Sequence, residues 1–296
     1  MQFLTFTLVY PFIWLFSILP FRVLYFISDC FYYLTYYVVG YRKKTVIHNL
    51  KLAFPDKSDK EIKDITKKSY RHFMDVFIEM MKAFTISKKS MLKRYKFTNI
   101  ELLQEFETND KSVLLLGSHY ANWEWVFCVN LLFTKYNAYG VIKKLKNSYF
   151  DKKIRQTRGR YRTKIVSTKE IFNIIDANTK NNITSIYGFL GDQSPKVNKT
   201  YHWAKFLGVH APIITGSEML AKKHNLTVIM FCTKKVKRGY YETTFKLLAE
   251  NPRDFKDYDI TDNYLRELEE SIYAAPEYYF WTHKRFKHEG KEPVGS

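Results

Sequence analysis

The pattern of hydrophobic and polar positions divides the chain into an apolar N-terminal segment and a longer region of alternating strand and helix patterns. Residues 3–19 carry no charged side chain, and residues 21–41 add only Arg22 and Asp29. From residue 112 onward, short apolar runs that are typical of buried strands alternate with stretches of helical spacing. This alternation predicts an α/β fold with a mostly parallel central sheet flanked by helices.

The clearest single element is a helix over residues 58–84. Ser58 followed by Glu61 has the arrangement of a capping box, and apolar residues then recur at helical spacing. Further helices are predicted at 123–133, 149–158, 169–178 and 216–224, the last of these being the final helix. Strands are predicted at 112–117, 138–142, 163–166, 183–187, 227–233 and 241–247.

The N-terminal apolar segment is rich in aromatic residues, which favours contact with a membrane. Pro11 lies inside the uncharged run and Pro20 follows it, and the run is at the short limit for crossing a bilayer. We therefore expect either one anchor helix or two helices at the membrane interface, because Tyr and Phe suit the headgroup level. The alternative is a hairpin buried in a soluble domain. Residues 1–41 are taken as this segment and residues 42–296 as one further domain.

The composition is strongly basic, so an acidic partner is expected. The 296 residues include 48 Lys+Arg against 29 Asp+Glu, which gives a formal net charge of +19. Nucleic acid, an anionic membrane, an acidic carrier protein or a phosphorylated substrate would each suit this charge. Nucleic acid is not expected, because the chain has no recognised binding motif for it and the apolar segment would have no role. Three widely separated cysteines, Cys30, Cys128 and Cys232, predict no disulfide framework and no paired-cysteine metal site.

The best candidate for catalysis follows the strand predicted to end at Gly117. Residues 118–124 read SHYANWE, and reactive groups in open α/β sheets lie beyond the carboxyl ends of strands. His119 could act as a general base that Glu124 orients. The two can meet only if His119 lies in the loop and Glu124 in the first turn of the next helix, capped by Asn122. The alternative is a half-exposed loop histidine and a glutamate that complements a helix dipole.

Two other polar clusters are candidates for binding a substrate. The segment GDQSP follows another predicted strand, so Asp192 and Gln193 would lie beside the first cluster and position a ligand or a side chain. The same segment is also typical of a simple turn. Residues 155–162 hold more arginines than one helix face can neutralise, and guanidinium groups such as Arg158 and Arg160 suit phosphate oxygens. Their alternative is a solvated helix end.

Several familiar catalytic motifs are absent from the sequence. It contains no phosphate-binding loop, no dinucleotide-binding glycine pattern, no serine-hydrolase elbow and no H-E-x-x-H zinc motif. These absences argue against nucleotide-driven phosphoryl transfer, serine-esterase chemistry and zinc proteolysis. The remaining acid–base groups favour direct transfer between two bound substrates.

The segment GSHYANWE at residues 117–124 resembles the H-x-x-x-x-D/E acyltransferase motif in the form found in lipid A biosynthesis late acyltransferases, the lauroyl and myristoyl acyltransferases. The N-W pair inside it makes the resemblance more specific than His and Glu alone. Similar segments are YRKKTVIHNLKLAFP at 41–55, GDQ at 191–193, FLGVHAP at 206–212 and FWTHKRFK at 280–287. The resemblance covers nearly the whole chain.

The resemblance implies an inner-membrane acyltransferase whose catalytic domain, residues 42–296, faces the cytoplasm. Such an enzyme would move a fatty acyl chain from acyl-acyl-carrier-protein to a hydroxyl of a 3-hydroxyacyl chain on a lipid A precursor, with no metal and no other cofactor. His119 and Glu124 would be catalytic. The expected substrate-binding residues are Asn122, Trp123, Arg158, Arg160, Asp192 and Gln193. The alternatives are an acyltransferase for another membrane glycolipid or aminolipid, and a non-catalytic basic protein of the membrane surface.

Overall fold

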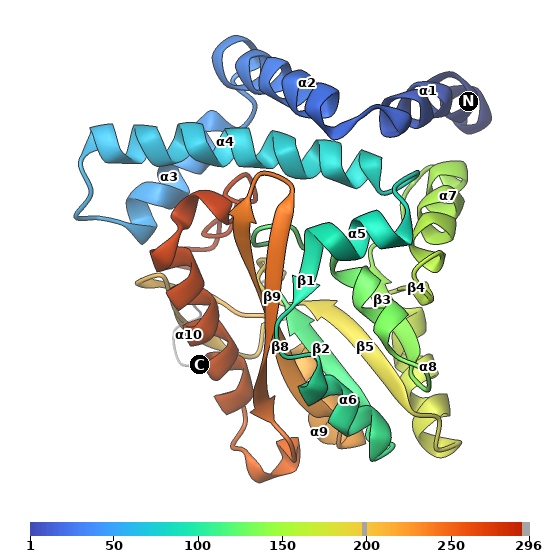
Figure 1. Ribbon diagram of the computed structural model, residues 1–296. Coiled ribbons are helices and arrows are strands. Elements are labelled where there is room, and N and C mark those ends of the chain that lie inside the picture. The colour runs from blue at the N-terminus through green and yellow to red at the C-terminus, as the bar shows by residue number, and fades with distance from the viewer. Residues whose placement is uncertain (197–199, 292–296) are drawn as a thin grey trace.

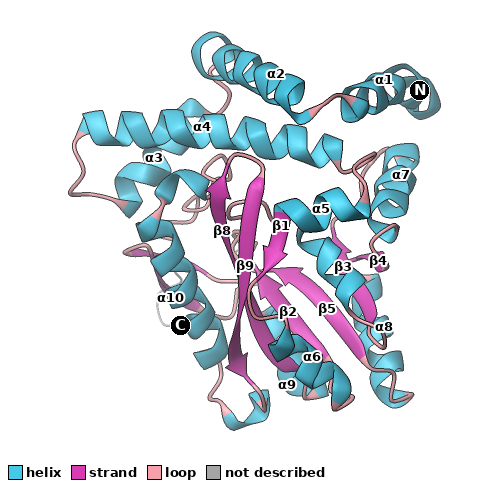
Figure 2. Cartoon of the chain, in the orientation of Figure 1, coloured by secondary structure: helices cyan, strands magenta, loops and turns pink. Residues whose placement is uncertain are grey.

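The computed structural model, which describes residues 1–196 and 200–291, contains a seven-stranded sheet flanked by helices (Figures 1 and 2). The strands, in spatial order, are β1 (Tyr95–Phe97), β9 (Tyr240–Ala249), β8 (Thr227–Lys237), β2 (Val113–Gly117), β5 (Ser185–Leu190), β3 (Asn137–Ile142) and β4 (Thr163–Ser167). Every neighbouring pair is parallel except β8 and β9. The predicted fold class, α/β with a mostly parallel sheet, is confirmed. A separate antiparallel pair joins β6 (Trp203–Phe206) to β7 (Val209–Pro212).

Helices cover the sheet and extend beyond one of its ends. Those of the sheet region are α3 (Lys43–Ala53), α4 (Asp59–Lys82), α5 (Lys88–Arg94), α6 (Glu101–Thr108), α7 (Ser148–Gly159), α8 (Glu170–Lys180), α9 (Gly216–His224) and α10 (Asp259–Ala274). The helix predicted over 58–84 is α4, and both hydrogen bonds of its Ser58–Glu61 capping box are present. The helices predicted at 149–158, 169–178 and 216–224 are also confirmed, as α7, α8 and α9.

The structure differs from the local predictions at several places. The helix predicted over 123–133 is a 3₁₀ helix, η2 (Val126–Leu132), because Asn122 and Trp125 bond to α4 and draw the preceding turn into the core. The strand predicted at 183–187 begins only at Ser185. Helix α10 is absent from the sequence-based assignment, although Leu265, Leu268 and Ile272 recur at helical spacing and are buried.

The N-terminal segment forms two helices, not one. Helix α1 (Gln2–Ile18) ends at the extended residue Leu19. Helix α2 (Phe21–Tyr33) begins after Pro20 and continues into the π-helical turn η1 (Leu34–Val39). Both helices lie on the outer side of α4, and α2 packs on it (Figure 1). Much of the apolar surface of α1 stays exposed, so the buried-hairpin alternative is wrong for this helix. Within residues 1–196 and 200–291, no helix combines the length and the apolar character needed to cross a membrane.

The division into residues 1–41 and 42–296 stays a prediction, and its endpoint at residue 296 lies outside the described residues.

The remaining short helices, η4 (Pro252–Asp254) and η5 (Pro276–Tyr278), flank α10. Residues 120 and 279 form an isolated bridge, which brings the chain after η5 back to the loop that follows β2.

Candidate active site

The candidate site lies where two adjacent parallel strands end. Gly117 at the end of β2 is opposite Leu190 at the end of β5, and the Gly191 amide donates to the Gly117 carbonyl oxygen at 3.1 Å. The loops after the two strands therefore start side by side, as expected for the carboxyl edge of a parallel sheet. A side chain at Gly117 would not fit, since a Cβ atom there would lie 1.9 Å from the ring of Phe231.

The imidazole of His119 contacts Asp192 and not Glu124. Asp192 Oδ1 lies 2.8 Å from His119 Nδ1 and also accepts the backbone N–H of His119 at 3.1 Å. On the other side of the ring, the Gln193 amide nitrogen lies 3.2 Å from Nε2. Since an amide nitrogen can only donate, these contacts assign the neutral tautomer with the proton on Nδ1 and a lone pair on Nε2. An imidazole oriented in this way can act as a general base.

The structure places Asp192 and Gln193 beside His119, the location that the sequence indicated, and their role in positioning a ligand or a side chain stays a prediction. The expected pairing of His119 with Glu124 is wrong in this structure. Glu124 instead forms an ion pair with Arg158 of α7, and both side chains are largely buried. The physical reason is the missing α-helical turn: the chain after Asn122 runs through turns into η2, which carries Glu124 toward α7.

The two members of the His119–Asp192 pair shift each other's pKa values. Burial by itself lowers the pKa of His119, but the Asp192 carboxylate outweighs it and leaves the pKa above the ordinary value. Burial raises the pKa of Asp192, and the charge and hydrogen bonds of His119 reverse this, so that its pKa lies below the ordinary value. The His119 share of the stabilisation is therefore complete below pH 6.5 and is lost as pH rises through the raised pKa. The Asp192 share is present above pH 3.8 and is lost as pH falls through the lowered pKa.

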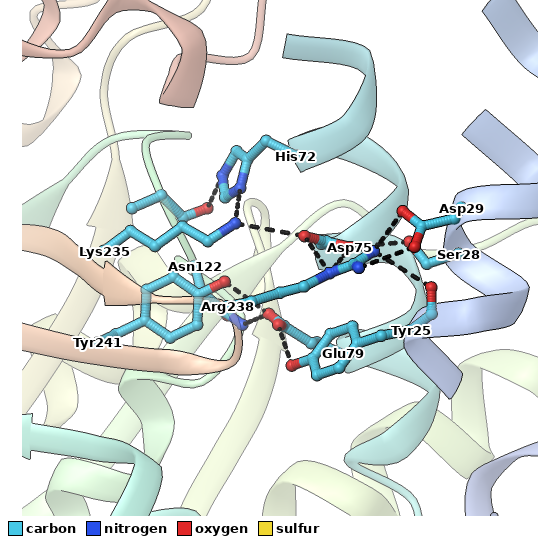
Figure 3. A network of polar contacts seen from close by, with 11 residues as sticks. Tyr25, Ser28, Asp29, His72, Asp75, Glu79, Asn122, Lys235, Arg238 and Tyr241 are labelled. Atoms are coloured by element: carbon cyan, nitrogen blue, oxygen red, sulfur yellow. Dashed lines mark hydrogen bonds and ion pairs between the residues drawn. The ribbon is translucent and has the colours of Figure 1, made fainter. Parts of the chain in front are cut away.

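Two aromatic rings frame the imidazole. The Trp123 ring centroid lies 5.2 Å from that of His119, and the Phe280 ring lies 5.8 Å from it at 26°. Trp123 is half-buried and also lines a cavity, which fits its predicted place at a substrate. Asn122 does not fit its predicted role, because its side chain is fully buried and donates to Glu79 at 2.6 Å (Figure 3). Its side-chain oxygen also accepts the Trp125 amide N–H at 3.0 Å.

The arginines of residues 155–162 have partners inside the protein, most of them on elements other than α7, which agrees with the expectation that one helix face could not neutralise them. Arg155 pairs with Asp151 at 2.7 Å, and Arg162 donates to the Phe133 carbonyl at 2.7 Å. Arg160 donates to the carbonyl oxygens of Phe84 and Ile86, just beyond the end of α4, at 2.5 and 3.0 Å. Its guanidinium is thus occupied by backbone, and the prediction that it binds substrate is not supported by these contacts.

A mostly apolar cavity opens beside this site, with about 580 Å³ of empty space when its open mouth is included. We call it the sheet-end cavity, because β2, β3, β5 and β8 contribute Leu115, Val141, Phe189, Leu190 and Phe231 to its wall. Trp123, Glu124 and Arg158 line it as well. The cavity therefore reaches the His119 region through Trp123, and the Glu124–Arg158 ion pair lies in its otherwise mostly apolar wall.

A second apolar cavity lies under α1, with about 790 Å³ of empty space when its open mouth is included, and we call it the α1 cavity. Its lining includes Ile13 of α1, Met80 and Phe84 of the α4 region, and Ile154 of α7. Glu124, Phe127 and Arg158 line both cavities. These three residues therefore form the partition between the two spaces.

The second loop of the site is held by a histidine that sequence reasoning did not single out. The Ser194 amide donates to His283 Nε2 at 3.2 Å, and burial lowers the pKa of His283 to about 4. This histidine is therefore neutral near pH 7 and can accept that hydrogen bond. The sequence pointed to His283 only through the segment FWTHKRFK at 280–287, which is one of those similar to the acyltransferase family.

The described residues contain no metal-binding cluster. No group of three or more His, Cys, Asp or Glu side chains in residues 1–196 and 200–291 could hold a metal ion. Cys30, Cys128 and Cys232 are free thiols.

Comparison with known proteins places these features in a family context. A family model described as bacterial lipid A biosynthesis acyltransferase matches residues 1–288. The chain is also similar to the lipid A biosynthesis lauroyltransferase of Escherichia coli (strain K12), with 24% identity over 278 residues. That alignment covers 93% of this chain and 89% of the relative.

Proposed function

Because the chain belongs to the bacterial lipid A biosynthesis acyltransferase family and is therefore an acyltransferase, we propose that it moves a fatty acyl chain from acyl-acyl-carrier-protein to a hydroxyl of a 3-hydroxyacyl chain on a lipid A precursor. The observation that carries this proposal is the His119–Asp192 pair beside an apolar cavity, where a base meets a place for an alkyl chain. A thioester donor supplies an activated carbonyl, so the protein needs only to position both substrates and move one proton.

In the proposed reaction, His119 Nε2 takes the proton of the acceptor hydroxyl as its oxygen attacks the thioester carbonyl. Asp192 holds the ring and stabilises the imidazolium that forms. The carbon–sulfur bond then breaks, and the carrier thiolate leaves with the proton from His119. The Gln193 amide, which lies at Nε2 in the free protein, is close enough to donate to a substrate oxygen once the hydroxyl takes its place.

The sheet-end cavity is the proposed site of the donor chain, and Phe127 limits its depth. Phe127→Ala is expected to open the partition toward the α1 cavity and to favour longer donors. Each further buried methylene contributes about 0.8 kcal/mol, so a donor two carbons longer should gain roughly tenfold in relative kcat/KM. Competition between carrier proteins loaded with different chains measures this. Phe172→Ala, at an exposed site on α8, is the control, and an unchanged length profile in Phe127→Ala would reject the assignment.

Arg158, at the same partition, is the proposed contact for a phosphate of the acceptor. Arg158→Ala is expected to raise the acceptor KM about ten- to hundredfold, because a charge-assisted hydrogen bond contributes about 1.5–3 kcal/mol. Lysine at this position should recover only part, since it lacks the planar fork. Steady-state kinetics with each substrate varied in turn is the measurement.

The matched control for this prediction is Arg160→Ala, whose guanidinium binds backbone carbonyls beyond α4. It should lower the melting temperature while leaving both KM values near those of the wild type. A rise in donor KM alone for Arg158→Ala, shrinking at high salt, would assign the residue to the carrier protein instead. Because Glu124 holds Arg158 in place, Glu124→Gln should raise the acceptor KM as Arg158→Ala does.

We further propose that residues 1–41 rest on the inner membrane with the catalytic domain on the cytoplasmic side. The support is the exposed apolar surface of α1, which includes Phe3, Leu8, Phe12 and Leu15. The net charge of +19 suits anionic headgroups, an acidic carrier protein and the phosphates of the acceptor. Flotation of the purified protein with anionic liposomes tests the placement.

The direct test of the proposed function is mass spectrometry of lipid A from cells with and without the protein. Loss of the protein should produce a species one acyl chain lighter, and purified protein with acyl-acyl-carrier-protein should restore that chain. Unchanged lipid A together with a change in another glycolipid or aminolipid would reject the proposed acceptor. Equal use of acyl-coenzyme A would reject the proposed donor preference.

A further inference from the structure

A buried polar network connects the N-terminal helix α2 to the loop that carries His119 (Figure 3). We call it the α4 network, because its central residues lie on one face of α4. It contains Tyr25, Ser28, Asp29, His72, Asp75, Glu79, Asn122, Lys235, Arg238 and Tyr241. The proposed reaction uses none of these side chains, so their burial needs another explanation.

Glu79 forms the first connection between this network and the loop. Its carboxylate is fully buried and accepts hydrogen bonds from the Tyr25 hydroxyl at 2.7 Å, the Tyr241 hydroxyl at 2.8 Å and the Asn122 amide at 2.6 Å. The backbone carbonyl of Glu79 also accepts the indole N–H of Trp125 at 3.0 Å. One residue of α4 thus holds two positions in the loop after β2.

His72 forms the second connection, about two turns before Glu79 in the same helix. Its Nε2 lies 3.2 Å from the Ala121 carbonyl oxygen, and the Lys235 ammonium lies 3.2 Å from its Nδ1. A lysine ammonium can only donate, so His72 is neutral and donates from Nε2 to the loop. Burial, followed by the charge of Lys235, lowers the pKa of His72 well below the ordinary value.

The backbone held by these contacts is strained. Ala121 has φ of +49°, in the left-handed region that residues with a side chain rarely occupy. Such a conformation persists only where its surroundings impose it. Here the surroundings include the hydrogen bond from His72 to the Ala121 carbonyl, the bond of the Ala121 amide to the Tyr278 carbonyl, and the side-chain bonds of Asn122. Ala121 and Asn122 follow His119 by two and three positions.

Helix α2 closes the network from outside. Arg238, in the turn between β8 and β9, bridges Asp29 of α2 at 2.8 Å and Asp75 of α4 at 2.7 Å. The Ser28 hydroxyl donates to Asp75 at 2.8 Å. Together with Tyr25, these contacts make α2 a wall of the site in which Glu79 is buried.

We propose that Glu79 and His72 are positioning residues of the acyl transfer, holding Ala121 and Asn122 so that His119 faces Asp192, and that α2 secures this arrangement through the Tyr25–Glu79 hydrogen bond. The inference rests on the proposed function of His119. It assigns the apolar N-terminal helices a second role, since the helix that packs on α4 also supports the geometry of the proposed base. A carboxylate buried among hydroxyls and an amide is a costly way to pack a core, which points to a role beyond stability.

The protonation of Glu79 supports this inference. Burial, followed by the charge of Asp75, raises the pKa of Glu79 to about 7, while Lys235, Tyr25 and Tyr241 act in the opposite direction. Since the ordinary value is 4.5, the unfolded chain ionises first, and the stability contributed at this site falls as pH rises from 4.5 toward 7. Above that range the carboxylate is charged and accepts all three hydrogen bonds.

Glu79→Gln separates positioning from stability. At pH 8 it is expected to lower kcat by about ten- to hundredfold, because small misplacements of a catalytic group have effects of this size, with little change in donor KM. Its melting temperature at pH 8 should equal or exceed that of the wild type, since a costly buried charge is removed. The pKa of His119, measured by NMR without substrate, should fall as the ring moves from Asp192. Tyr25→Phe should show the same pattern more weakly.

The control is Tyr70→Phe, which removes a hydroxyl donating from α4 to the Tyr41 carbonyl outside the network. It should leave kcat and the His119 pKa unchanged. Wild-type kcat and His119 pKa in folded Glu79→Gln would overturn the proposal. If Glu79→Gln does not fold, wild-type values of both in Tyr25→Phe would overturn it. If Glu79→Gln shifts the His119 pKa but the wild-type protein acylates no lipid A precursor, the positioning role is retained and the proposed function is rejected.

Discussion

His119→Ala is expected to lower the kcat for acyl transfer by about 10²–10⁴, the usual contribution of a positioned base. The side chain supplies the imidazole nitrogen Nε2, whose lone pair faces the Gln193 amide, while Asp192 occupies Nδ1. Alanine removes the base together with its ring contacts to Trp123 and Phe280, since the side chain is only 19% exposed, so the melting temperature of the variant is measured as well. Transfer from acyl-acyl-carrier-protein to a lipid A precursor, measured with purified protein, reports the loss.

His202→Ala is the matched control for this experiment. His202 forms the same kind of contact with a carboxylate, to Asp262 at 2.7 Å, but lies outside the candidate site. Turnover of this variant should stay close to that of the wild type. If His119→Ala instead retains wild-type turnover while folded, His119 is not the base.

Asp192→Asn is expected to lower kcat by about 10²–10⁴ as well, because the amide cannot stabilise an imidazolium and can reverse the tautomer. It should also move the pH profile. In the wild type, kcat/KM rises as His119 loses its proton, at a pH above its ordinary pKa of 6.5, because Asp192 raises that pKa. Without the carboxylate, burial dominates and lowers the pKa, so the acidic limb of the profile should shift to lower pH.

Glu124→Gln distinguishes the two carboxylates in the same measurement. Asp192 raises the pKa of His119 more than Glu124 does. The acidic limb of the kcat/KM profile should therefore move less in Glu124→Gln than in Asp192→Asn. A larger shift for Glu124→Gln would show that Glu124, and not Asp192, orients the imidazole during the reaction.

Elements with a local cause could be predicted from the sequence. Helix α4 follows from a capping box and apolar spacing that lie within its own residues, and β2 follows from a short apolar run. The location of His119 and of Asp192 after strand ends follows from the same local patterns, together with the rule that parallel strands present their carboxyl ends at one edge. The family resemblance was also available from short segments of sequence, and the family match confirms it.

The partners of these residues depended on the tertiary structure. Strand β5 lies beside β2, although β3 and β4 come between them in the chain, and this order brings Asp192 to His119. Spacing within one segment favoured Glu124, whose partner Arg158 comes from α7. The arginines of 155–162 looked unpaired because their partners are mainly carbonyl oxygens and carboxylates of other elements.

The same distinction explains the α4 network and η2. Hydrophobic periodicity predicts which face of a helix is buried, but it does not reveal which buried polar groups will meet across elements. Asn122 is a good helix cap by local rules, and its side-chain oxygen accepts the Trp125 N–H, but its amide nitrogen donates to Glu79 of α4, a partner that local rules do not reveal. Local patterns thus determined the elements and the candidate base, because their causes act within a few residues. Strand order and burial decided the hydrogen-bond partners, because a buried polar group must find its partner wherever the fold places one.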